Sequence, residues 1–124
     1  MIASLIIALA LLAALAVLQV LVASGLPLGR FVWGGAHRVL PRRLRIGSAV
    51  SVPVYAGFAV LLLSRAGALP GADNVIVVVL TWVLFAYFAF GVVLNGISRS
   101  RAERFTMTPA CAVLAVTALI IALG

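Results

Sequence analysis

The stretch IASLIIALALLAALAVLQVLVA, residues 2–23, carries no charged side chain, and its polar residues are Ser4 and Gln19. About 20 apolar residues in helical form cross the hydrocarbon core of a bilayer. A cleavable signal peptide has a positive N-terminal region and an apolar run of about 7–15 residues. No positive residue precedes this run, which is also longer than such a segment. We therefore expect a retained transmembrane helix.

The rest of the chain has the same character. Of its 124 residues, 66% are hydrophobic and 9% are charged, whereas about a quarter of the residues in a soluble domain are charged. Three further apolar runs are long enough to span a bilayer: residues 44–64, 74–97 and 105–123. The sequence predicts an all-α polytopic membrane protein, a four-transmembrane-helix bundle formed by residues 1–124 as a single membrane domain.

Local signals mark where these helices begin. Pro41 suits the start of the second helix, and Asp73 is the N-cap that we predict for the third. Ser100 and Glu103 have the spacing of a capping box, which predicts that the last helix begins before the apolar run. Pro109 either kinks that helix or starts it, and both interpretations stay open.

The connections differ strongly in charge. The predicted loops 25–43 and 98–104, with the residues beside them, hold eight of the nine basic residues, namely Arg30, Arg38, Arg42, Arg43, Arg45, Arg99, Arg101 and Arg104. Because basic loops stay in the cytoplasm, the chain is predicted to be N-out/C-out. The net charge of +7 would indicate nucleic acid in a soluble protein. Here topology explains it, so we expect anionic phospholipids as partners and no nucleic acid.

Polar side chains within the spans gather in the predicted cytoplasmic half. Ser48, Ser51 and Tyr55 share one helix face, as do Tyr87 and Asn95 on another helix. One interpretation is a polar vestibule between the helices. The other is ordinary hydrogen bonding between helices. The candidate vestibule residues are Gln19, Ser48, Ser51, Tyr55, Tyr87 and Asn95.

The inventory of reactive side chains is small, with one His, one Cys, one Asp and one Glu. These residues are too few for a metal cage within one chain, and no acidic residue is expected inside a span. An enzyme is therefore not favoured, no catalytic residue is assigned, and no metal or cofactor is expected.

Two runs carry a resemblance: GRFVWGGAHRVLPRRLRIGSAVS, residues 29–51, and NGISRSRAERFTMTP, residues 95–109. They contain Trp-Gly-Gly-x-His and Asn-x-x-Ser-Arg-Ser. In these patterns the chain resembles a group of small four-helix bacterial membrane proteins of unknown function. The resemblance implies a multi-pass protein of the bacterial cytoplasmic (inner) membrane and supplies no activity.

Three functions remain open. The first is a small accessory or structural protein that binds a partner, while its basic face contacts anionic lipid headgroups. The second is a small oligomeric transporter or channel for a polar or anionic solute. The third is a lipid-headgroup binder or lipid-modifying enzyme that uses His37. A homo-oligomer or a larger membrane-protein partner is compatible with these functions. The candidate headgroup-binding residues are Trp33, His37, Arg38, Arg42, Arg43, Arg45, Arg99 and Arg101.

Overall fold

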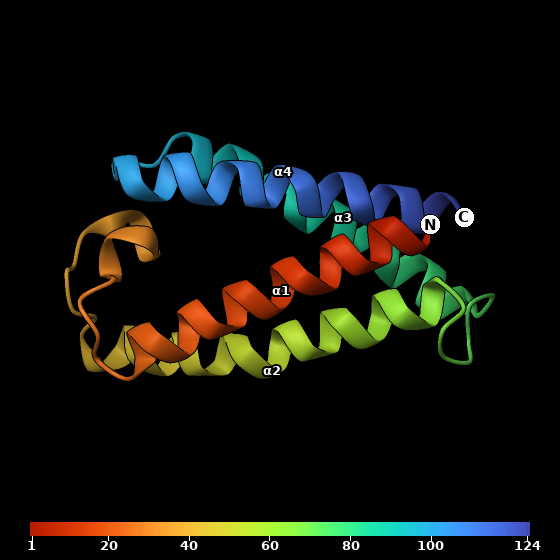
Figure 1. Ribbon diagram of the computed structural model, residues 1–124, viewed down its shortest axis with the longest axis horizontal. Helices are drawn as coiled ribbons and strands as arrows, with labels where there is room; N and C mark the ends of the chain where they lie inside the picture. The colour runs from red at the N-terminus through yellow and green to blue at the C-terminus, as the bar shows by residue number, and fades with distance from the viewer.

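The computed structural model describes residues 1–124, and all of its regular elements are helical. Four long helices follow one another along the chain (Figure 1): α1 Ile2–Ala23, α2 Arg42–Arg65, α3 Val75–Gly96 and α4 Arg101–Leu123. Each of the four is long and apolar enough to cross a membrane. The prediction of an all-helical chain with four such helices is confirmed.

The helix ends follow the local signals, with one correction. α1 has the predicted bounds, and α2 begins directly after Pro41. The predicted N-cap of α3 was wrong, because Asn74 holds that position and its side chain accepts the Ile76 N–H at 2.9 Å. The Asn74 N–H also donates to the Gly71 carbonyl, so Asp73 lies inside a turn, one residue too early to cap the helix.

α4 begins well before its apolar run, as the capping-box spacing predicts. The Ser100 hydroxyl accepts the Glu103 N–H at 3.3 Å, which satisfies one of the free donors at the helix start. The helix then continues without interruption through Pro109 to Leu123, so this proline does not start it. Consequently Glu103 belongs to the first turn of α4, before the apolar run that begins at Phe105.

The helices form two hairpins, α1–α2 and α3–α4, that pack on each other. The two helices within each hairpin contact each other more extensively than any two helices from different hairpins do. Both chain termini lie at one end of the molecule, on the right in Figure 1, and the long loop between α1 and α2 lies at the opposite end. The arrangement therefore places the two basic loops together.

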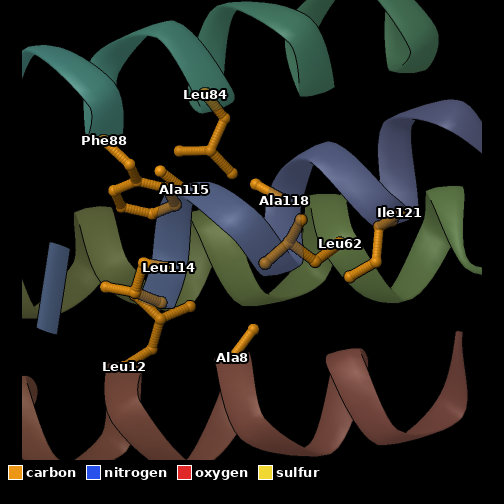
Figure 2. Close-up of a cluster of buried hydrophobic side chains, with 9 residues drawn as sticks. All are labelled: Ala8, Leu12, Leu62, Leu84, Phe88, Leu114, Ala115, Ala118 and Ile121. Carbon is orange, nitrogen blue, oxygen red and sulfur yellow. The ribbon is translucent and has the colours of Figure 1, made fainter. Parts of the chain in front are cut away.

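The hydrophobic core lies where the hairpins meet in the half nearer the termini. All four helices contribute side chains to it (Figure 2), and α4 supplies the largest share; the cluster comprises Ala8, Leu12, Leu62, Leu84, Phe88, Leu114, Ala115, Ala118 and Ile121. In the same view Leu12 of α1 points toward Leu114 of α4. The half of the bundle nearer the termini is therefore closed by direct packing of apolar side chains.

The outward faces of the helices are also apolar. Only 22 of the 124 residues are buried, and many large Ile, Val, Leu and Phe side chains are exposed, such as Ile6, Val79 and Phe90. A soluble monomer rarely exposes apolar surface on this scale. Lipid is the environment that this surface fits.

Candidate functional site

The loop between α1 and α2 folds back onto the bundle end. Two single turns of 3₁₀ helix, Gly29–Phe31 and Trp33–Gly35, lie between α4 and the α1–α2 hairpin (Figure 1). We call residues 29–35 the lid segment. A Cβ atom on Gly29 would overlap the backbone of His37 and Arg38, and the Gly29 N–H donates to the Arg38 carbonyl at 2.9 Å. The glycine therefore lets the loop close on itself.

Trp33 fastens the lid segment to α2. Its indole N–H donates to the Ser48 hydroxyl at 2.9 Å, and Ser48 is fully buried. The indole ring lies against Gly47, where a Cβ atom would approach the ring to 2.9 Å. Ser48 and Gly47 thus form the binding surface for the Trp33 side chain on α2.

The other side of the lid segment is fastened to the start of α4. The Gly34 N–H donates to Glu103 Oε2 at 3.1 Å, and the Ser100 hydroxyl donates to the Arg30 carbonyl. Gly35 packs so closely on the Ser100 side chain that no Cβ atom fits there. In a complete capping box Glu103 would bind the backbone of Ser100. Here its side chain is used instead to hold the lid segment.

A pocket of about 470 Å³ lies between the two hairpins, bounded on one side by the lid segment. Its volume falls within the range of about 300–1,000 Å³ that is usual for small-molecule sites. Leu12, Phe88 and Leu114 line it and also belong to the hydrophobic core. The pocket therefore extends from the loop end of the bundle to the closed half.

The polar groups of the pocket are tied together within each hairpin. Gln19 Nε2 donates to the Tyr55 hydroxyl at 3.3 Å, which joins α1 to α2. Asn95 Nδ2 lies 3.3 Å from Cys111 Sγ, which joins α3 to α4. None of these bonds crosses from one hairpin to the other. Gln19 is half-buried, but its side-chain carbonyl oxygen is buried and has no hydrogen-bond partner.

The structure brings together five of the six candidate vestibule residues. They line the pocket from three helices and are Gln19, Ser51, Tyr55, Tyr87 and Asn95. Ser48 does not line it, because the Trp33 indole covers its hydroxyl.

Sequence reasoning did not assign to this site several residues that line it, namely Phe31, Val32, Gly34, Glu103 and Cys111. The capping-box spacing did single out Glu103, but only as a helix-start signal. Its second role depends on a contact with Gly34, which is 69 residues away in the chain.

The candidate headgroup residues lie at the loop end, and of these only Trp33 lines the pocket. Five arginines there are exposed: Arg38, Arg42, Arg43, Arg99 and Arg101. Arg45 is half-buried, and its Nε donates to the Ala23 carbonyl at 2.9 Å, which caps the end of α1. His37 is half-buried and does not line the pocket. The histidine is therefore separate from the polar band between the hairpins.

Comparison with known proteins gives no further guide to this site. No protein-family model, curated protein or solved structure matches the chain. The resemblance to small bacterial membrane proteins stays a prediction.

Proposed function

We propose that this chain is a multi-pass protein of the bacterial inner membrane, with its basic loops in the cytoplasm and both termini outside. Four apolar helices with apolar outward faces support insertion. The gathering of basic residues in the first and third loops supports the orientation.

We further propose that the protein binds a small amphipathic solute from the cytoplasmic side, as a small transporter or solute-binding subunit does. The observation that carries this proposal is the pocket between the hairpins, which reaches Asn95 and is lined by Ser51 and Tyr55. If the polar residues served only to join helices, close packing would be expected around them. Instead they hydrogen-bond within their own hairpins and leave space between the hairpins.

The composition of the pocket indicates the kind of solute. Of its 20 lining residues, 13 are hydrophobic, and five of the others provide side-chain amide, hydroxyl and carboxylate groups, namely Gln19, Ser51, Asn95, Ser98 and Glu103. Small-molecule sites commonly combine a largely apolar wall with a few convergent polar groups that fix orientation. The solute therefore carries both an apolar body and a polar group.

The exposed arginines support a second role that is compatible with the first. Arg38, Arg42, Arg43, Arg99 and Arg101 lie at the end where phospholipid headgroups would be, and each basic residue near an anionic surface adds about 1 kcal/mol of attraction. In this proposal they hold the protein in an anionic leaflet. An accessory role toward a partner protein or a second copy would use the same basic face.

Cys111 allows a direct test of the pocket, because it is the single cysteine and lines the pocket wall. In purified full-length protein, a bound solute should slow alkylation of Cys111 by N-ethylmaleimide. We expect the neutral amphiphile triphenylphosphine oxide to protect the thiol, and Ser51→Phe to remove the protection because the ring fills the pocket.

Val54→Phe is the matched control, since Val54 lies on the same helix but is exposed on its outer face. It should leave the protection unchanged. Mass spectrometry of the alkylated fraction measures the rates. Equal protection in both variants, or none in the native protein, would contradict the proposed function.

A further inference from the structure

The pocket contains one charged side chain, and it is acidic. Glu103 lines the pocket, whereas no arginine, no lysine and no histidine does, although the chain carries a net charge of +7. The pocket therefore excludes the basic side chains that dominate the charge of the rest of the chain. The interior chemistry is that of a site for a positively charged group.

Glu103 is buried but keeps one oxygen free. The residue is only 6% exposed, and Oε2 accepts the Gly34 N–H at 3.1 Å. Oε1 accepts no hydrogen bond within the protein and keeps some accessible surface. A buried carboxylate is costly unless its charge is compensated. A cation in the pocket would supply that compensation.

Aromatic side chains surround the same space. Phe31 and Trp33 line it from the lid segment, and Tyr55, Tyr87 and Phe88 line it from α2 and α3. Aromatic faces attract cations, most strongly where water is excluded. An apolar cation would thus meet attractive surfaces on several sides as well as the carboxylate.

The nearby arginines do not cancel the attraction of the pocket for a cation. Arg30 is exposed and its guanidinium lies over Phe31, outside the lining, while Arg104 donates to the Ser98 carbonyl at 3.3 Å. Charges in contact with water or headgroups are screened over about 10 Å at 0.1 M salt. The buried Glu103 carboxylate is screened much less, so it dominates the electrostatics within the pocket.

We infer that the ligand of this pocket is an amphipathic organic cation, with Glu103 as its counter-charge. This inference rests on the proposed function and narrows it, because the exposed arginines alone would favour an anionic solute. The positive group would lie near Glu103 at the loop end, and the apolar body would extend toward Leu12 and Leu114.

The test uses three probes of related shape and different charge: tetraphenylphosphonium, neutral triphenylphosphine oxide and anionic tetraphenylborate. Each is titrated against full-length protein, and protection of Cys111 from alkylation is measured. Tetraphenylphosphonium should protect at the lowest concentration and tetraphenylborate should not protect. Glu103→Gln should raise the tetraphenylphosphonium concentration needed by at least about tenfold, as expected when a buried charge partner is removed. Its effect on protection by the neutral probe should be much smaller, because triphenylphosphine oxide carries no net charge for the carboxylate to pair with.

Two further variants keep the test decisive. Asp73→Asn removes the only other carboxylate, which is exposed in the loop before α3, and should change nothing. Glu103→Asp retains the charge and should restore the preference for the cation over the neutral probe.

The inference is overturned if the cation and the neutral probe protect equally in native protein and in Glu103→Gln. It is also overturned if Glu103→Gln and Glu103→Asp both lose all protection, because the carboxylate would then only hold the lid segment. If no probe gives protection that Ser51→Phe abolishes, the proposed function fails as well.

Discussion

Trp33 is the residue on which the loop conformation depends. Its backbone lies in the left-handed region, with φ at 52°, a conformation that costs a residue with a side chain about 1–2 kcal/mol. The hydrogen bond to Ser48 and the contact with Gly47 offset this cost. The backbone conformation of Trp33 is therefore stabilised by these tertiary contacts and not by the intrinsic preference of a tryptophan.

The hydrogen bond between Trp33 and Ser48 should contribute measurably to stability. Trp33→Phe keeps a ring against Gly47 but loses the N–H donor, and Ser48→Ala removes the acceptor. Each change should lower stability by about 1 kcal/mol. The double variant should cost no more than either single one, because both remove the same bond. Thermal unfolding in detergent, followed by circular dichroism, measures the effect.

Trp82→Phe is the control for this pair, since Trp82 is partly exposed on α3 and packs edge-on against Phe85. It should change the melting temperature little. Additive losses in the double variant would show that Trp33 and Ser48 act independently.

At the scale of elements, the lid segment and the start of α4 form one unit. Ser100 caps α4 and also holds Arg30, while Glu103 in the first turn holds Gly34. The loop also buries the apolar side chains of Val32 and Leu40 in a small cluster with Val22 of α1, so these polar bonds and close contacts act together with apolar packing to fix its position. Local opening is expected where such contacts are few.

Gly34 and Gly35 both need a positive φ angle, but only Gly35 also lacks space for a side chain. Gly34 and Gly35 have φ at 75° and 71°, so alanine is strained at both. At Gly34 the added Cβ meets no atom within 4 Å, whereas at Gly35 it collides with Ser100 and lies 3.0 Å from the Arg30 carbonyl oxygen.

We therefore expect Gly35→Ala to displace the lid segment and to increase the rate of Cys111 alkylation severalfold. Gly34→Ala should have a smaller effect. Alkylation rates measured side by side in detergent test this order. If the two variants react equally fast, packing on Ser100 does not control access to the pocket.

At the scale of the whole molecule, the basic residues gather at one end of the helix bundle. The loop of residues 24–41 lies at the end of the bundle opposite to both termini (Figure 1), and the exposed arginines gather there. The opposite end has Arg65, whose guanidinium donates to the Ala122 carbonyl at 3.1 Å and so ties α2 to the end of α4. The bundle therefore has one strongly basic end and one nearly neutral end.

The orientation of this bundle is testable with single cysteines in a Cys111→Ala background. Ala36→Cys in the first loop should be labelled only from the cytoplasm, and Ala68→Cys in the second loop only from outside, because both positions are exposed at opposite ends. A membrane-impermeant maleimide applied to intact cells and to inverted vesicles measures this. Labelling of both positions from one side would contradict the four-span topology.

The sequence by itself determined the number of helices, their bounds to within a few residues, and the grouping of basic residues in two loops. These features depend on local properties, because a run of about 20 apolar residues must form a helix to satisfy its backbone in lipid. The shared faces of Ser51 and Tyr55, and of Tyr87 and Asn95, also follow from helical spacing alone. Five of the six candidate vestibule residues were therefore within reach of sequence reasoning.

Only the tertiary structure decided the rest. The sequence left open whether the polar band joins helices or lines a space, because that depends on how the hairpins pack. It did not indicate that Trp33 would cover Ser48, or that Glu103 would accept a hydrogen bond from Gly34, which is 69 residues away in the chain. Such contacts carry no local pattern, since they arise when separate helix ends meet. The charge of the pocket therefore comes from the fold, although the charge of the surface is already evident from the chain.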